Sequence, residues 1–301
     1  MSLSDLKRRI GTVKNTSKIT KAMSLISAAQ ISKLKYKLQS YEKYHKLIGE
    51  TAASIALKGR TRLDTDTKRI TVDDQLVVES CQKHCGIQRS YIVGKKKLLV
   101  VITGEKGLCG SFNSSVVSKV LSMTDEETDL ICLGKKGFEM LSKSRKKKVK
   151  IIDNNYIELN PKKISTKIVM ERVTENLLRL LASNTYSTVE VIYTEFISML
   201  KQEVKSKSLF PLILDNHNFE EITFDSNPMA MLDHIIPQYI NAEMYFTILH
   251  SVKSETVKRM MTMDNANKNS KEMLNDLTLK YNRARQTKVT MELIEVISGM
   301  L

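Results

Sequence analysis

The stretch that decides the fold runs from Gln238 to Ser298 and reads QYINAEMYFTILHSVKSETVKRMMTMDNANKNSKEMLNDLTLKYNRARQTKVTMELIEVIS. It contains neither glycine nor proline, which interrupt a helix interior at a cost of about 1 and 3 kcal/mol. Lys, Leu, Met, Ala, Glu and Gln are frequent, and apolar residues recur mostly at every third or fourth position. The stretch therefore predicts one unbroken helix of roughly 90 Å.

A second long helix is predicted at the other end of the chain, from about Ser2 to Lys58. Glycine and proline are again missing from Thr12 to Ile48, and this helix would extend roughly 85 Å. The apolar stripe on each helix is narrow and partly polar. Neither helix fits within a single globular domain, and two helices of matched length most economically pair as a long antiparallel coiled coil.

The middle of the chain has the alternating pattern of a Rossmann-like α/β domain. The apolar run within Lys97–Thr103 is typical of a strand that is buried on both faces. Strands are predicted at 97–103, 129–133 and 188–194, and helices at 112–121, 136–144 and 165–183. This alternation predicts a small, mostly parallel sheet that is covered by helices. Residues 61–96 are polar and irregular, and no element is assigned to them.

Three domains follow from these elements. An N-terminal shaft helix is predicted at 1–58, a central globular α/β domain at 59–237, and a C-terminal shaft helix at 238–301. Within the central domain, residues 61–96 form a diverged loop region. A length of 301 residues suits one large domain or two modest ones, so size excludes none of this.

The chain is basic, with a formal net charge of +15. Residues 1–60 hold thirteen Lys and Arg against three Asp and Glu, whereas 238–301 holds nine against seven. The excess therefore lies mainly on the first helix, which is expected to be solvated, to face an acidic surface or to meet phosphate.

Four cysteines, Cys81, Cys85, Cys109 and Cys132, occur in a chain without an apolar secretion signal near its start. We expect a reducing compartment and free thiols. No run approaches the roughly 18 consecutive apolar residues of a membrane-spanning helix, so the chain is expected to be soluble or peripheral to a membrane.

The sharpest candidate for chemistry is the glycine-rich stretch Thr103–Ser111, TGEKGLCGS, which follows a predicted strand and precedes a helix. Phosphates often bind at such a turn. The glycines, however, are spaced GxxGxxG, which does not match the dinucleotide pattern GxGxxG, and no Gly-Lys-Ser/Thr completes a Walker loop. A structural tight turn is therefore favoured over a nucleotide site.

For the other candidate sites, a structural role is likewise favoured over ligand binding. Cys81, His84 and Cys85 suggest a metal site, but unligated thiols on a loop are favoured because no second ligand pair exists elsewhere. The basic runs 95–97 and 145–148 are interpreted as solvated edges and loop ends rather than phosphate sites.

The remaining histidines and methionines add no catalytic constellation. None of the remaining histidines has a serine, cysteine or carboxylate partner at motif spacing. These histidines are His45, His217, His234 and His250. Three clustered methionines are interpreted as adaptable helix-packing residues, and are Met260, Met261 and Met263.

Both ends of the chain resemble the gamma subunits of bacterial-type ATP synthases. The run from Arg259 to Ser298 is similar to the closing helix of that family, whose pattern is met by Val289, Thr290, Glu292, Glu295 and Gly299, with Met300 in place of the usual Ala. Leu6–Ile10 and Val13–Met23 are similar to its opening helix. Thr103–Asn113 resembles its strand-turn motif, with Gly104 and Glu105 replacing Ser and Asp, and Asn227–His250 also follows the family.

The resemblance implies a non-catalytic rotor without a cofactor. The coiled coil would insert into a hexamer of alpha and beta subunits, and the globular domain would rest with epsilon on the proton-driven c-ring at the cytoplasmic side of the cell inner membrane. Arg285 and Gln286 would make polar contacts with the beta subunits, with Met23 beside them, and Arg8 and Arg9 would lie toward the upper shaft.

One alternative of another class stays open. The charge of the first sixty residues is also typical of a basic coiled-coil protein that binds nucleic acid. Few aromatic residues interleave with the basic runs, so base stacking has little support.

Overall fold

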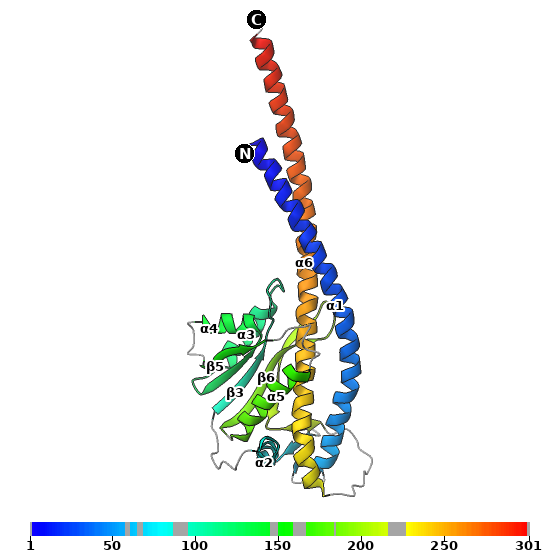
Figure 1. The fold of residues 1–301 in the computed structure, drawn as a ribbon, viewed down its shortest axis with the longest axis vertical. Helices are drawn as coiled ribbons and strands as arrows, with labels where there is room; N and C mark the ends of the chain where they lie inside the picture. Colours follow the sequence, from blue (N-terminus) through cyan, green and yellow to red (C-terminus); the bar gives the residue numbers. More distant parts are fainter. Residues whose placement is uncertain are drawn as a thin grey trace. The chain divides into compact units, whose positions relative to one another are not determined.

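The computed structural model describes residues 2–57, 61–64, 69–86, 96–144, 150–158, 167–183, 185–215 and 227–299. The chain divides into two compact units, one made of residues 1–31 and 256–301 and the other of residues 32–255. Two long helices, α1 (Leu3–Leu57) and α6 (Pro228–Ser298), contribute to both units (Figure 1). These helices confirm the fold class predicted from the two ends of the sequence.

The start of α6 differs from the prediction. The helix begins at Pro228 rather than Gln238 and continues through Pro237, although proline removes a backbone donor from a helix interior. The helix start has its own signals, because Asn227 Oδ1 accepts a hydrogen bond from the Met229 N–H at 3.0 Å and Pro228 occupies the favoured first position. Burial of the helix around Pro237 outweighs the lost hydrogen bond, and the buried residues there are Leu232, Ile236 and Ile240.

In the first unit, α1 and α6 pair in antiparallel orientation through a thin, half-polar seam. Ser17 Oγ donates to Asn267 Oδ1 at 2.9 Å, and Ser24 Oγ donates to Asp264 Oδ1. The buried residues of the two helix segments include four small polar ones and one arginine, and are Leu6, Thr20, Ser24, Ser27, Thr256, Val257, Arg259, Met263 and Leu277. Such a seam provides less apolar burial than a regular coiled coil of the same length.

The second unit contains a five-stranded sheet in the order β5-β4-β3-β6-β7. Its strands are β5 (Lys150–Ile157), β4 (Thr128–Leu133), β3 (Lys96–Ile102), β6 (Tyr186–Phe196) and β7 (Gln202–Phe210). All neighbouring pairs are parallel except β6 and β7. The three strands predicted from sequence are β3, β4 and β6, so the parallel-dominated sheet is confirmed.

Helices cover both faces of this sheet. On one face, α3 (Phe112–Met123) and α4 (Lys135–Ser142) pack over a cluster that includes Leu99 and Val101. The other face joins a larger core that includes Leu98 and Val100 and residues of α1, α6 and α5 (Lys167–Ala182). Alternate residues of β3 thus enter different cores, which explains its continuous apolar run.

The sequence left residues 61–96 without elements, but the structure places several there. β1 (Thr61–Asp64) and β2 (Arg69–Val72) form a small antiparallel sheet with β8 (Ile213–Asp215). They are followed by α2 (Asp74–Cys85). Within the described part of the chain, no helix combines the length and apolar character that crossing a membrane requires.

Candidate partner-contact site

The last part of α6 lies in the first unit, and no described residue of this chain covers it. Figure 1 shows α6 continuing well past the N-terminal end of α1. Every described residue from Arg285 to Gly299 is exposed. Six of them are large apolar residues with exposed fractions between 49% and 62%, namely Val289, Met291, Leu293, Ile294, Val296 and Ile297.

These six residues are distributed over most of the helix circumference, since successive residues turn by about 100°. An ordinary surface helix confines its apolar residues to one stripe, so this end of α6 does not resemble one. Contiguous exposed apolar surface of this kind marks a site of contact with another protein. The end of α6 is therefore the strongest candidate for a functional surface.

Arg285 and Gln286, two of the predicted contact residues, lie at the base of this apolar end and are exposed. Met23 does not lie beside them. Its neighbour Ser24 bonds to Asp264, and Arg285 is about 30 Å farther along α6 than Asp264. The antiparallel register separates the two positions, so the predicted proximity within this chain is wrong.

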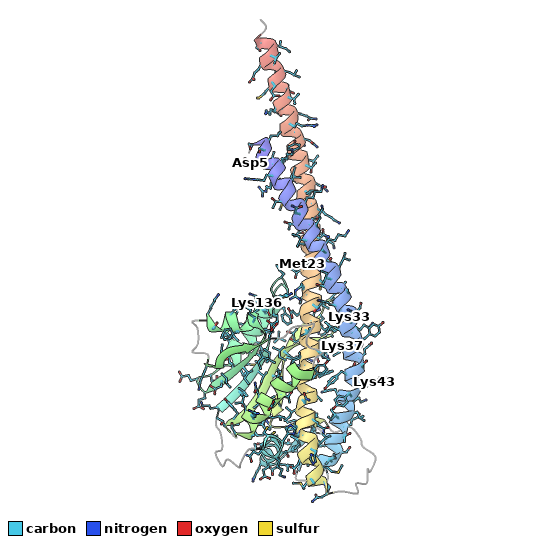
Figure 2. The ribbon with its side chains drawn as sticks, viewed as in Figure 1. Asp5, Met23, Lys33, Lys37, Lys43 and Lys136 are labelled. Atoms are coloured by element: carbon cyan, nitrogen blue, oxygen red, sulfur yellow. The ribbon has the colours of Figure 1, made fainter. Side chains whose placement is uncertain are left out.

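Arg8 and Arg9 are exposed near the free end of α1, and Arg8 forms an ion pair with Asp5 at 3.6 Å. Figure 2 shows Asp5 near this end and Met23, which is half-buried, well away from it on the same helix. Asp5 is the only acidic residue among the first 31 residues. The α1 part of the first unit therefore presents a basic surface, made of Lys7, Arg8, Arg9, Lys14, Lys18 and Lys21.

The glycine-rich turn is tied into the second unit by hydrogen bonds. Thr103 Oγ1 accepts from the Gly137 N–H at 3.0 Å and donates to the carbonyl oxygen of Leu133 at 3.1 Å. The Gly104 N–H donates to Asn113 Oδ1 at 2.9 Å, and a Cβ at Gly104 would lie 2.6 Å from Glu255 Oε1. The hydrogen bonds fasten the turn to α3 and α4, and Glu255 on α6 leaves no room for a side chain at Gly104, which supports the structural interpretation.

The cysteine and histidine candidates take structural positions. Cys81 and Cys85 lie on the helix α2 rather than on the predicted loop, because Asp73 caps its start and Gly86 ends it. The four thiols are free, and burial raises the pKa of Cys81 to about 12. Across the described ranges, no three metal-binding side chains come together.

Of the two basic runs, Lys96 and Lys97 form ion pairs with Asp129 and Glu190, at 3.8 and 2.9 Å. The run 145–148 lies outside the described residues. Among the three methionines, Met263 is buried in the seam and the other two are half-buried, as expected for packing residues.

Two histidines have partners that the sequence analysis missed. His45 Nε2 donates to Glu243 Oε2 at 2.8 Å, and His250 Nδ1 accepts from the Phe196 N–H at 3.3 Å. These partners are separated by 198 and 54 residues, so no motif spacing could reveal them. His234 is exposed, and His217 lies outside the described residues.

Two long antiparallel helices, an uncovered apolar helix end and an α/β domain inserted between the helices in the sequence define a shaft-type subunit. The comparisons with known proteins narrow this class. A family model described as ATP synthase matches residues 2–301. The chain belongs to the ATP synthase gamma chain family.

Relatives and solved structures agree with this membership. The ATP synthase gamma chain of Geotalea uraniireducens is 31% identical, over 99% of this chain and 97% of its own length. That of Rickettsia bellii is 29% identical, over 99% and 98%. A chain of the Euglena gracilis mitochondrial ATP synthase rotor has the same fold, with a TM-score of 0.62 at 14% identity over 95% of this chain and 98% of its own.

Proposed function

We propose that this chain is the central-stalk rotor of an ATP synthase. It couples proton flow through a membrane ring to conformational change at catalytic sites on alpha and beta subunits, and it carries out no chemistry itself. Membership in the gamma chain family supports this role, as do the two long helices.

The uncovered apolar end of α6 carries the proposal. A shaft that turns inside a sleeve needs contacts all round, and this helix end presents apolar side chains over most of its circumference. Because the helix pair is asymmetric, each orientation offers different contacts to the surrounding catalytic sites. Such differential contacts are what shifts the conformational equilibrium of those sites.

Each of the two units has its own proposed partners. Alpha and beta subunits form a ring around the shaft helices, while epsilon and the membrane c-ring contact the α/β domain. The protein would thus be peripheral, on the cytoplasmic side of the cell inner membrane. Arg285 and Gln286 make polar contacts with the beta subunits, and Met23, Arg8 and Arg9 contribute further contacts along the shaft.

Reconstitution tests the rotor role directly. Alpha and beta subunits are assembled with and without this chain, and ATP hydrolysis and rotation of a probe fixed to the α/β domain are measured. We expect this chain to support rotation driven by ATP hydrolysis. Unchanged hydrolysis and a stationary probe would refute the proposal.

The contact residues are tested by charge reversal at Arg285. Arg285→Glu places a negative charge at the base of the apolar helix end and should weaken proton pumping more than assembly. Lys271→Glu reverses an exposed charge on the same helix and serves as the control. Equal pumping by the two variants would remove Arg285 from the contact site.

The family match favours the rotor over the nucleic-acid-binding alternative. Nucleic-acid binding predicts retention on DNA that decreases steeply with salt. We expect co-purification with alpha and beta subunits and no salt-sensitive retention on DNA.

A further inference from the structure

Glu243 is a fully buried carboxylate on the face of α6 that meets the α/β domain. Its side chain is 1% exposed. His45 Nε2 lies 2.8 Å from one carboxylate oxygen, and Lys207 Nζ lies 2.6 Å from the other. Burial opposes ionisation, but the hydrogen bond from His45 and the charge of Lys207 outweigh it and hold the pKa of Glu243 below its ordinary value.

The three residues come from three elements. His45 belongs to α1, Glu243 to α6, and Lys207 to β7, the outermost strand of the five-stranded sheet. The His45–Glu243–Lys207 cluster therefore joins both long helices to the sheet through one side chain. All three residues lie within the second unit, so the cluster holds this unit together internally.

A second set of contacts runs beside this cluster. The ring of His45 stacks on that of Phe246, with centroids 4.2 Å apart and planes 8° from parallel. Phe246 packs edge-on against His250, whose Nδ1 accepts from the Phe196 N–H on β6. Farther along α6, Lys253 Nζ lies 3.8 Å from the centre of the Phe196 ring. α1 is thus linked to β6 as well as to β7.

Directional contacts of this kind differ from apolar packing. An apolar helix face can slide or turn against a sheet while keeping much of its contact area, because the hydrophobic effect has no direction. Moving α6 away from His45 or Lys207 would instead leave a charge buried without a partner, which is strongly unfavourable. The cluster therefore resists sliding and turning of the helix pair against the sheet.

We propose that His45, Glu243 and Lys207 are positioning residues that make the helix pair and the sheet turn as one body. This inference rests on the proposed rotor function. Torque applied to the α/β domain reaches the helices through this cluster. A cluster with one partner removed should let the helices slip and so lower the number of protons pumped per ATP hydrolysed.

Removing Lys207 alone tests the proposal in the assembled ATP synthase. Lys207→Met leaves Glu243 buried beside a neutral side chain. We expect ATP hydrolysis to be retained while the pumping-to-hydrolysis ratio falls by about half or more. The double variant Lys207→Met/Glu243→Gln leaves no unpaired charge but still lacks the ion pair, so its ratio should stay as low as that of the single variant.

Lys205→Met is the matched control, since Lys205 lies two residues earlier on β7 and pairs with Glu195 at 2.5 Å near the surface. A ratio for Lys207→Met equal to that of Lys205→Met would overturn the proposal, as would a double variant that restores the ratio. If the unmodified chain itself fails to couple pumping to hydrolysis, the rotor function fails instead.

His45 provides a second test that does not depend on the folding of the Lys207 variant. His45→Gln keeps a side-chain donor toward Glu243, whereas His45→Leu keeps bulk and removes the donor. We expect normal coupling with glutamine and reduced coupling with leucine, at temperatures where circular dichroism shows both variants folded. Equal coupling in the two variants would contradict the proposal.

Discussion

His250 is a half-buried histidine that the structure keeps neutral. Burial lowers its pKa to about 4, and its Nδ1 accepts a backbone hydrogen bond from Phe196, which only an unprotonated ring nitrogen can do. An unfolded chain would bind a proton there from about pH 6.5 downward, whereas the folded chain binds one only near pH 4. Stability should therefore decrease as pH falls from about 6.5 to 4.

The variant His250→Asn tests this dependence of stability on pH, because asparagine retains a hydrogen-bond acceptor but does not titrate in this range. As the pH falls from 6.5 to about 4, the free energy of unfolding of the variant should decrease by about 1–2 kcal/mol less than that of the original chain. This figure allows for the partial exposure of His250. Urea unfolding between pH 4 and 7 measures it. His234→Asn, a substitution at an exposed histidine, is the matched control.

Gly134 adopts a backbone conformation that side chains rarely tolerate. Its φ is +99°, and a Cβ there would lie 2.2 Å from the carbonyl oxygen of Thr103, a backbone atom that cannot move aside. Gly134→Ala should destabilise the protein by about 2–4 kcal/mol. Thermal unfolding would show this loss, while Gly107→Ala, which meets nothing within 4 Å, should change stability little. Similar melting temperatures for both variants would contradict the expectation.

Among the elements, α2 was missed because its sequence is polar, although its two ends carry recognisable signals. Asp73 Oδ1 accepts from the Gln75 N–H at 2.9 Å, and Gly86 ends the helix in the left-handed conformation. Asp73→Ala should reduce stability by about 1 kcal/mol, whereas Asp73→Ser keeps a capping oxygen and should not. Hydrogen exchange of the α2 amides would distinguish the two variants.

The strands found from sequence are those buried on both faces. β3 and β4 contain the continuous apolar runs Leu98–Ile102 and Leu130–Leu133, which are typical of such strands. β7, in contrast, reads QEVKSKSLF and lies at the edge of the sheet, where β6 is its one neighbour among the described strands. Its mixed pattern of polar and apolar residues does not identify it as a strand, because two of its charged side chains are paired with residues of other elements. Lys205 and Lys207 form ion pairs with Glu195 and Glu243, and only the folded structure shows these pairs.

At the scale of the whole molecule, the uncovered end of α6 should contribute little to the stability of the isolated chain, because its described side chains are all exposed. A chain ending at Ala284 loses only residues that are exposed or lie at the terminus. We expect its melting temperature to match that of the full chain, while its binding to alpha and beta subunits decreases strongly.

Truncation at the other end provides the contrast. A chain lacking residues 1–9 loses Leu6, which is buried in the seam, and should therefore unfold more readily. Melting followed by circular dichroism and pull-down with alpha and beta subunits measure the two properties separately. A large loss of stability in the chain ending at Ala284 would contradict the assignment of this end to a partner.

The sequence by itself determined the two long helices, the buried parallel strands and the family, because helix breakers, apolar periodicity and short motifs are local properties. The division into three domains, at 1–58, 59–237 and 238–301, stays a prediction. Only the tertiary structure decided that α6 continues through Pro237, since burial overrides the local preference of that residue. It alone brought His45, Glu243 and Lys207 together, because the value of a buried charge depends on partners that are distant in the chain.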